Sequence, residues 1–253
     1  MCPKFFIFLY FVILIDGACI ISNLSIPRYN PTATSVGKMV LFAGGWNDNA
    51  ISIVDMLNTS SNSWTSHHLE TNPGFMTSAS VVDVAFFNGG TVLDVYNATS
   101  NTWYTTSLSV QRYNEAVASS GNYAIWAGGL STAEGQLTSV VEIFTYSGIG
   151  TGTWKTASLS EARYKMAATA VGNYFLFAGG HNGTTSVKTV EIYNTETNSW
   201  SMTNLPEERW AATGTFYAIS AGGLAFFTGY TQIVDVFNPS TFLWTTAQSS
   251  TTK

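Results

Sequence analysis

Charge, cysteine and clusters of basic residues are all scarce in this sequence. Only 10% of the 253 residues are Asp, Glu, Lys or Arg, whereas an average soluble domain has roughly 25%. Solubility must therefore depend on Ser, Thr, Asn and Gly, a composition typical of short strands joined by tight turns. The formal net charge is -5 and the basic residues form no stripe. We therefore expect neither nucleic acid nor an anionic membrane surface as a partner.

Both cysteines, Cys2 and Cys19, lie in or at the edge of the first nineteen residues. The rest of the chain can form no internal disulfide and no cysteine-based metal or redox site. No other residue pattern indicates a metal or a cofactor, and we expect none. The fold must therefore be held together by its apolar core.

Residues 1–19 resemble a secretory signal peptide. Lys4 supplies a positive charge, and the apolar run Phe5–Ile15 has the length of about 7–15 residues seen in such peptides. A bilayer span needs roughly 20 residues. The small residues near Ala18 would permit cleavage, so we expect a signal peptide at 1–19, a folded domain at 20–253 and a secreted, extracellular protein. Two alternatives remain: an uncleaved segment that anchors the protein to a membrane through residues 5–15, and a buried first strand.

Four Asn-X-Ser/Thr sequences would accept glycans on a eukaryotic secretory route. They begin at Asn23, Asn58, Asn97 and Asn182. Asn58 and Asn97 occupy a repeated turn position, where Asn is also favoured by its own hydrogen bonds to the backbone. Asn182, in a loop, is the best candidate.

The chain contains five similar units. Each closes on a tryptophan: Trp64, Trp103, Trp154, Trp200 and Trp244. Four begin with an arginine, and the second has Pro73-Gly74-Phe75 instead; the arginines are Arg28, Arg112, Arg163 and Arg209. In the first four units a pair of glycines follows at a constant distance. In the fifth, Gly222-Gly223 fits better as the first hairpin turn, with Thr228-Gly229-Tyr230 in the place of the glycine pair.

Each unit predicts four strands. In the fourth unit they are Met166–Val171, Tyr174–Ala178, Thr189–Tyr193 and Ser199–Asn204. The first is rich in small residues, the second is apolar on both faces, and the fourth is the most polar. A single four-stranded sheet cannot bury two apolar faces, but sheets stacked around an axis can. The pattern therefore predicts an all-β protein, a β-propeller of about five four-stranded blades.

The Arg-Tyr, Phe-Ala-Gly-Gly, Val-Glu-Ile-Tyr-Asn and Asn-Ser-Trp elements of the fourth unit resemble kelch repeats, and the resemblance covers about residues 20–248. Kelch propellers usually have six or seven blades. We expect five blades in one domain, with Ile20–Ser25 adding an outer strand to the last blade and closing the ring. The alternative is an incomplete six- or seven-bladed ring.

An acid recurs on the third strand of every unit, opposite the recurring arginines. The acids are Asp55, Asp94, Glu142, Glu191 and Asp235. Charges in such register favour ion pairs between strands or blades. The alternative is that arginines such as Arg112 and Arg163 line the mouth of the central channel and bind an anionic ligand.

Loops between the second and third strands vary most in length, and binding usually resides in surface loops on a rigid scaffold. The long ones are Trp46–Ser52, Leu130–Ser139 and His181–Lys188. Our candidate binding residues in these loops are Trp46, Asn47, Asp48, His181 and Lys188. For Trp46, packing on its own blade is an equal alternative.

No catalytic arrangement is evident. The histidines are His67, His68 and His181, and the adjacent pair would point to opposite faces of a strand. We therefore predict a non-catalytic module that recognises a protein or glycan through its inter-strand loops. The alternative implied by the resemblance is a secreted carbohydrate-modifying enzyme, similar to a sialic-acid epimerase, with its site at the channel mouth.

Overall fold

The structure is a computed structural model of the 253-residue chain. It describes residues 11–15, 18–70, 76–90, 92–131, 135–209, 216–229 and 232–248. Every regular element in these ranges is a β-strand. The described residues contain no helix with the length and hydropathy needed to cross a membrane.

Five four-stranded antiparallel sheets follow one another along the chain, and we call them blades 1 to 5. Blade 1 contains β3 (Thr32–Val36), β4 (Met39–Ala43), β7 (Ile53–Asn58) and β8 (Ser63–His68). Blade 2 contains β9 (Thr77–Val81), β10 (Val84–Asn88), β11 (Leu93–Asn97) and β12 (Thr102–Thr106). Blade 3 contains β14 (Ala116–Ser120), β15 (Tyr123–Ala127), β17 (Val140–Gly148) and β18 (Thr151–Ser158).

Blade 4 contains β19 (Ala167–Val171), β20 (Tyr174–Ala178), β21 (Thr189–Asn194) and β22 (Ser199–Asn204). Blade 5 contains β23 (Tyr217–Ala221), β24 (Leu224–Thr228), β25 (Ile233–Asn238) and β26 (Leu243–Gln248). The predicted strands of the fourth unit are thus confirmed to within one residue at each end. The reassigned turn at Gly222-Gly223 is also confirmed, because it joins β23 to β24.

Among the described residues, three short strand pairs lie outside the four-stranded sheets. β5 (Trp46–Asn47) pairs with β6 (Asn49–Ala50), and β13 (Arg112–Tyr113) pairs with β16 (Leu130–Ser131). A further hairpin, β1 (Phe11–Ile15) with β2 (Ala18–Ser22), precedes blade 1.

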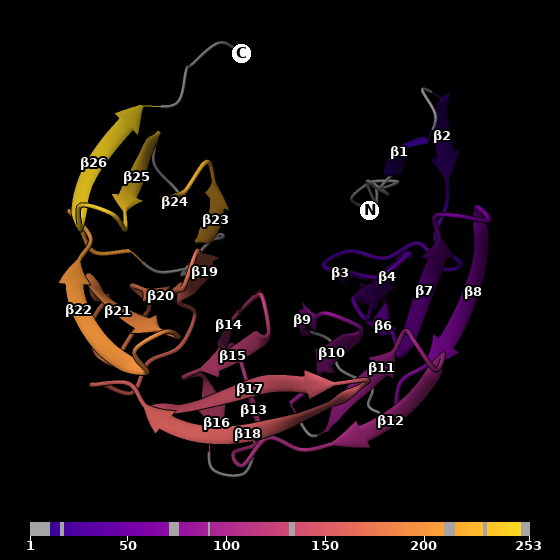
Figure 1. Ribbon diagram of the computed structural model, residues 1–253, viewed down its shortest axis with the longest axis horizontal. Helices are drawn as coiled ribbons and strands as arrows, with labels where there is room; N and C mark the ends of the chain where they lie inside the picture. The colour runs from indigo at the N-terminus through magenta and orange to yellow at the C-terminus, as the bar shows by residue number, and fades with distance from the viewer. Residues whose placement is uncertain are drawn as a thin grey trace, which may run out of the picture.

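The blades are arranged around an axis, with their first strands innermost (Figure 1). Small side chains let these inner strands approach: Thr32 and Ser78 share a hydrogen bond of 2.6 Å between blades 1 and 2. Outer strands such as β8, β12 and β22 have mostly exposed residues. The predicted order from a small-residue inner strand to a solvated outer strand is therefore confirmed, and the fold is a β-propeller.

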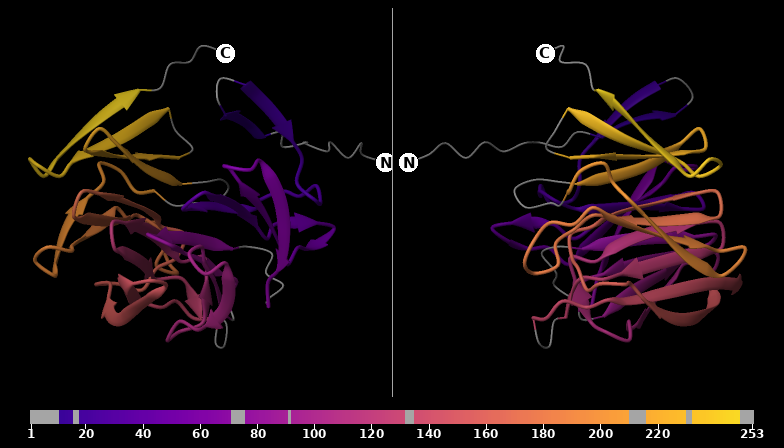
Figure 2. Two further views of the ribbon diagram at one scale, coloured as in Figure 1. Left: turned by 45° about the vertical axis from the view of Figure 1, so that its right-hand side comes forward. Right: turned by 90° about the vertical axis from the view of Figure 1, so that its left-hand side faces the viewer.

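Apolar cores lie between neighbouring blades, where sheet faces stack. Four clusters of buried side chains join blade 1 to 2, 2 to 3, 3 to 4 and 4 to 5. No such cluster among the described residues joins blade 5 to blade 1. The opening between these blades is visible in Figure 1 and in the left view of Figure 2. The five blades form an open arc.

The prediction for Ile20–Ser25 is wrong. Strand β2 pairs with β1, whereas the outer strand of blade 5, β26, pairs with β25. Strand β1 immediately precedes β2 in the chain, and this gives β2 a nearer partner than blade 5. Of the run Phe5–Ile15, only the last five residues are described, as β1. Cleavage of this segment stays a prediction.

Candidate recognition face

Arginine–carboxylate pairs occur in four of the five blades, between the residue that leads into the inner strand and the acid of the third strand. The pairs are Arg28–Asp55, Arg112–Glu142, Arg163–Glu191 and Arg209–Asp235. The predicted ion pairing is confirmed for these four. In blade 2, Asp94 accepts a hydrogen bond from the backbone N–H of Glu70 at 3.1 Å. Residues 73–75, predicted to replace the arginine there, lie outside the described residues.

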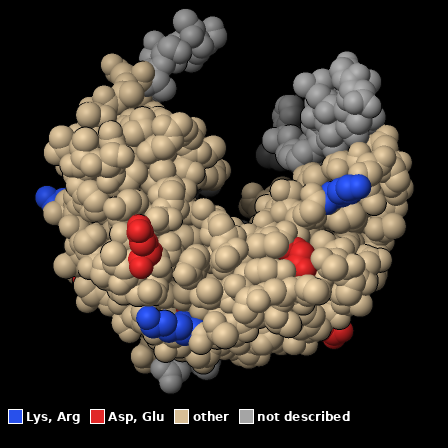
Figure 3. Space-filling model, viewed as in Figure 1, with Lys and Arg blue, Asp and Glu red and all other residues tan. Residues whose placement is uncertain are grey.

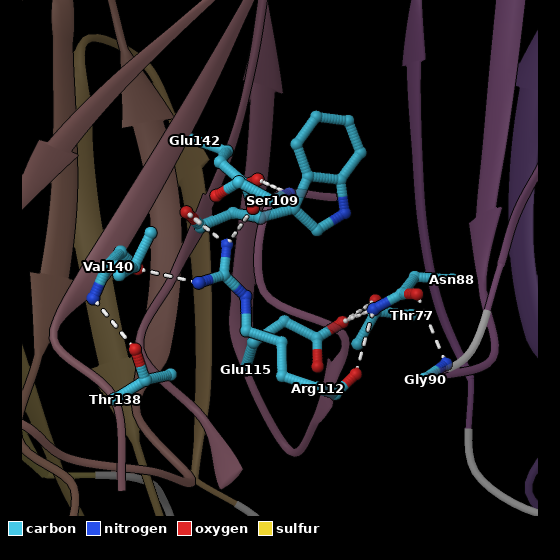
Figure 4. Close-up of polar contacts among 10 residues, drawn as sticks. Thr77, Asn88, Gly90, Ser109, Arg112, Glu115, Thr138, Val140 and Glu142 are labelled. Carbon is cyan, nitrogen blue, oxygen red and sulfur yellow. Dashed lines mark hydrogen bonds and ion pairs between the residues drawn. The ribbon is translucent and has the colours of Figure 1, made fainter. Parts of the chain in front are cut away.

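Arg112 shows what these arginines do (Figure 4). Its Nη2 donates to Glu142 Oε2, and its Nη1 donates to the carbonyl oxygen of Val140 at 2.8 Å. Burial lowers the pKa of Arg112 below its usual value, and the nearby carboxylates Glu142 and Glu115 offset part of this shift. The guanidinium thus fastens the start of the inner strand to the third strand of the same blade.

The arginines do not line an open channel mouth. Arg112 and Arg163 are both 0% exposed, and Arg163 donates to the carbonyl oxygens of Gly179 and Thr189 as well as to Glu191. A ligand would have to displace these bonds to reach either guanidinium. We therefore do not retain Arg112 and Arg163 as binding residues.

The tyrosine that follows each of three arginines is placed differently. Tyr29 exchanges two backbone hydrogen bonds with Trp46, at 3.0 and 2.9 Å, and Tyr164 does the same with His181, at 3.1 and 3.0 Å. Tyr113 pairs in the same register with Leu130. We call these three pairs the tyrosine bridges. Each joins the start of an inner strand to the residue after a glycine pair, so all three lie at the same end of the blades.

The glycine pair permits each bridge. Gly45 has φ +93°, and a Cβ there would lie 2.7 Å from the carbonyl oxygen of Tyr29. This is a conformation and a contact that glycine alone tolerates well. Tyr29 and Tyr113 are accessible, at 59% and 38% exposed, whereas Tyr164 is half-buried. The bridges therefore fix the backbone of the loops while leaving aromatic rings at the surface.

The long loops leave directly from the bridges. After Trp46, the chain turns at Asp48 (φ 59°) in the β5–β6 hairpin. In blade 4, the ring of His181 lies edge-on to that of Tyr164 with centroids 5.8 Å apart, and Lys165 Nζ is 5.7 Å from the Tyr164 centroid. The Nδ1 atom of His181 accepts a hydrogen bond from the N–H of Gly183 at 3.0 Å, which holds the ring in place.

The other predicted loop residues lie on the same face or beside it. Asn47 is half-buried, and Asp48 and Lys188 are exposed. Trp46 is half-buried within the first bridge. Its burial fits both packing on its own blade and contact with a ligand. The three tyrosines were not among our candidates, although their recurrence after arginine was a visible signal.

Charge is sparse on the molecular surface. On the side seen in Figure 3, the few Lys, Arg, Asp and Glu residues are separated from one another by uncharged atoms. The face around the tyrosine bridges combines aromatic rings and amides with Asp48 and two lysines, Lys165 and Lys188. Such a surface can stack on apolar faces and form hydrogen bonds.

A buried carboxyl lies between blades 2 and 3. Glu115 Oε1 accepts hydrogen bonds from Thr77 Oγ1 and, at 2.7 Å, from Asn88 Nδ2 (Figure 4). Burial raises the pKa of Glu115, against the opposing effect of these hydrogen bonds. In the repeat, Glu115 and Asn88 occupy the positions that Met166 and Ala178 occupy in blade 4. Two polar residues at positions that are apolar in blade 4 were the sequence signal for this contact.

His67 and His68 form no site with each other. The His67 ring stacks on Trp103 with centroids 4.2 Å apart, and burial lowers the pKa of His67. The described residues contain no group of three or more His, Cys, Asp or Glu side chains that could hold a metal ion.

The predicted glycan acceptors differ in accessibility. Asn23 is exposed and Asn182 is half-buried, with Nδ2 donating to Glu161 at 2.8 Å. The Oδ1 atoms of Asn58 and Asn97 each accept two backbone N–H groups within their turns, and Asn97 is 8% exposed. Asn58 and Asn97 thus have the structural role that their turn position suggested, and glycosylation of all four residues stays a prediction.

Comparisons with known proteins agree with the architecture. Residues 162–203, which include all of blade 4 except its last residue, match the family model described as "Kelch motif". Among the solved structures that resemble this chain is one described as "Structure of YjhT", with a TM-score of 0.67 and 13% sequence identity over 92% of this chain and 88% of that chain. At that identity the likeness concerns the fold alone. The curated proteins contain no match. The kelch resemblance is confirmed by these findings.

Proposed function

We propose that this kelch-repeat propeller is a non-catalytic recognition module that binds a protein or glycan through the face formed by its tyrosine bridges and inter-strand loops. The observation that carries the proposal is the repetition of one tyrosine, paired through its backbone with the residue after a glycine pair, at the same end of three blades. The rings of two of these tyrosines, Tyr29 and Tyr113, are exposed. A rigid backbone that presents aromatic rings loses little conformational entropy on binding.

The residues around the bridges support recognition of polar and apolar surface together. Tyr29 supplies an exposed ring, and Trp46 begins the β5–β6 hairpin that contains Asn47 and Asn49. In blade 4, His181 and Lys165 flank Tyr164. Aromatic rings with neighbouring amides are suited to sugar faces and to peptide segments alike.

Substitution of the exposed tyrosines tests the proposal. The protein would be applied to a glycan array and to a phage-displayed peptide library, and the hits re-measured with Tyr29→Ala and Tyr113→Ala. We expect either substitution to weaken the selected interaction at least tenfold. Tyr104→Ala is the matched control, because Tyr104 is 42% exposed on the outer strand of blade 2. Binding unaffected by both bridge substitutions, or no hit from either library, would sink the proposal.

The enzymatic alternative depended on arginines at a channel mouth. Because Arg112 and Arg163 are buried in ion pairs, no observation favours it as a second function.

We also propose that the protein is exported, on the strength of the residue order in 1–19. The intact mass of protein recovered from the medium of a eukaryotic secretory host tests this. A mass lacking the first 17 to 19 residues and carrying glycan would support export. Retention of the full, unglycosylated chain in the cell would contradict it.

A further inference from the structure

A pocket lies between blades 1 and 2, at the end of the blades opposite to the tyrosine bridges. It has a volume of about 480 Å³, and ligand pockets in proteins range from about 300 to 1,000 Å³. Its lining comes from the β3–β4, β9–β10 and β11–β12 turns and from the adjoining parts of β4, β7, β8 and β11. Lys38 and Met39 belong to blade 1, and Asp83, Tyr96 and Asn101 belong to blade 2.

The pocket coincides with a departure of blade 1 from the repeat. Met39, the first residue of the second strand, corresponds to Tyr123 in blade 3 and Tyr174 in blade 4. The ring of Tyr123 packs edge-on against Phe175 of the next blade, with centroids 6.4 Å apart. The ring of Tyr174 packs in the same way on Phe242, at 5.5 Å. Because methionine has no ring, Met39 leaves open the room that an aromatic ring fills at these two other junctions.

Blade 2 retains the wall that such a ring would contact. Tyr96 corresponds to Tyr193 of blade 4. The hydroxyl of Tyr96 donates to Asn101 Oδ1 at 2.8 Å, and that of Tyr193 donates to Asn198 Oδ1 at the same distance. Tyr123 packs against the buried cluster that contains Tyr193. An aromatic ring in the pocket would therefore lie beside Tyr96 as Tyr123 lies beside Tyr193.

Charge distinguishes the two sides of the pocket. On blade 2, Asp83 Oδ2 accepts a hydrogen bond from Thr99 Oγ1 at 2.9 Å, and Asp83 Oδ1 accepts one from the N–H of Gly150 at 3.3 Å. On blade 1, Lys38 is exposed and forms no ion pair with any described residue. The carboxylate of Asp83 is thus already hydrogen-bonded within the fold, whereas the ammonium of Lys38 has three donors for an anionic group on a ligand.

We propose that this pocket binds a small aromatic acid, a molecule with one six-membered aromatic ring and a carboxylate. The ring would lie between Met39 and Tyr96, where a methionine sulfur and a second aromatic ring both pack favourably against it. The carboxylate would lie toward Lys38 at the rim of the pocket. The site is separate from the face of the tyrosine bridges and does not depend on the recognition function proposed for that face.

Titration of the protein with phenylacetate, followed by ligand-observed NMR, tests the proposal. We expect saturable binding with a dissociation constant of roughly 1 mM or below, as suits a ligand of so few atoms. Phenethylamine has the same ring and the opposite charge, and it should bind at least fivefold more weakly. Acetate, which lacks the ring, should not bind detectably.

Met39→Tyr fills the pocket from blade 1. Blades 3 and 4 have tyrosine at this position, so the fold should tolerate the substitution, with a melting temperature equal to or above that of the wild type. We expect it to abolish phenylacetate binding. The matched control is Leu224→Tyr, which introduces a tyrosine at the corresponding position of blade 5 and should bind phenylacetate as the wild type does. Lys38→Met should weaken binding about two- to fivefold, the effect of one exposed charge.

Asn101→Phe fills the pocket from blade 2. Blade 5 has Phe242 at the corresponding position, with nearly the same positive φ of 57° against 55° for Asn101. This variant should also lose phenylacetate binding. The proposal is overturned if phenylacetate does not saturate the protein, if phenethylamine binds as tightly, or if both filled variants fold and still bind. Tyr29→Ala should leave binding unchanged, and a loss there would place the site on the opposite face and overturn the assignment.

Discussion

Blades 4 and 5 have the same strand pattern, the same arginine–carboxylate pair and the same closing tryptophan, yet they differ in exposure. In blade 4 both faces are covered, and β20 is buried along nearly its whole length. In blade 5 the face toward blade 4 is covered, whereas the opposite face is exposed at Ile219, half-buried at Phe226 and buried at Val236, which is 9% exposed. Strand β24 alternates between buried and half-buried residues. The inner strand β23 is mostly exposed, whereas β19 alternates between buried and half-buried residues.

The difference shows that the side chains on a sheet face of this fold are buried by the neighbouring blade. A kelch-type sheet has two apolar faces, and each needs a neighbour. The substitutions below test this by comparing the same position in a covered and an uncovered environment.

The largest effect is expected for the buried ion pairs. Arg163→Met should lower the free energy of unfolding by about 3–5 kcal/mol, because it leaves Glu191 buried without its cation. Arg209→Met should cost a similar amount, since Asp235, at 0% exposed, lies on the covered face of blade 5. Urea denaturation measures both. A negligible cost for either would contradict the assignment, and Arg163→Met combined with Glu191→Leu should recover much of the loss.

The second test compares two equivalent residues on the same face of blades 4 and 5, Leu176 and Phe226. Leu176→Ala should cost about 2–5 kcal/mol, because Leu176 is 0% exposed in the core between blades 4 and 5. Phe226→Ala should cost about 1 kcal/mol, because its ring is already partly in water. Equal costs, measured by denaturant unfolding, would mean that the blade 5 face is covered in solution.

The third test extends the comparison to the junction of blades 2 and 3. The pKa of Glu115 is raised in the folded state, so the folded protein binds this proton more tightly than the unfolded chain does. Stability is therefore lost as the pH rises from the unfolded value of about 4.5 through the folded pKa. Glu115→Gln cannot titrate and should gain in melting temperature relative to the wild type between pH 4 and pH 8. A constant difference across that range would refute the assignment.

The smallest effect is expected on the face of blade 5 that points away from blade 4. Ile219→Thr introduces the residue type that blade 4 has at the same position, Thr169. Since Ile219 is 66% exposed, the free energy of unfolding should change by no more than about 0.5 kcal/mol. Calorimetry would detect a larger destabilisation, which would indicate that a neighbour covers this face in the free protein.

Much of the fold could be predicted because it is local. The fourth unit's strands follow from runs of small, aromatic and alternating residues and from the turns between them. The pairing of arginines with third-strand acids also followed, since charges in register recur at fixed positions. The depth of burial of Arg112 and Arg163 did not follow, because sequence spacing does not show which way a long side chain extends.

The functional face was predicted only in part. Loop lengths indicated the region of Trp46 and His181, but the tyrosine bridges depend on hydrogen bonds between segments that lie 17 residues apart in the chain, as for Tyr29 and Trp46. The pairing of Glu115 with Asn88 joins two blades, and the repeat pattern predicts neither partner.

The amino-acid sequence by itself determined the repeating four-stranded unit, its turns and its charge pairs, because these depend on contacts within one unit. Only the tertiary structure decided which faces are covered, where the arc stays open and where β1 and β2 lie. Those features depend on contacts between units far apart in the chain, and identical sequence patterns are buried or exposed according to whether a neighbouring sheet is present.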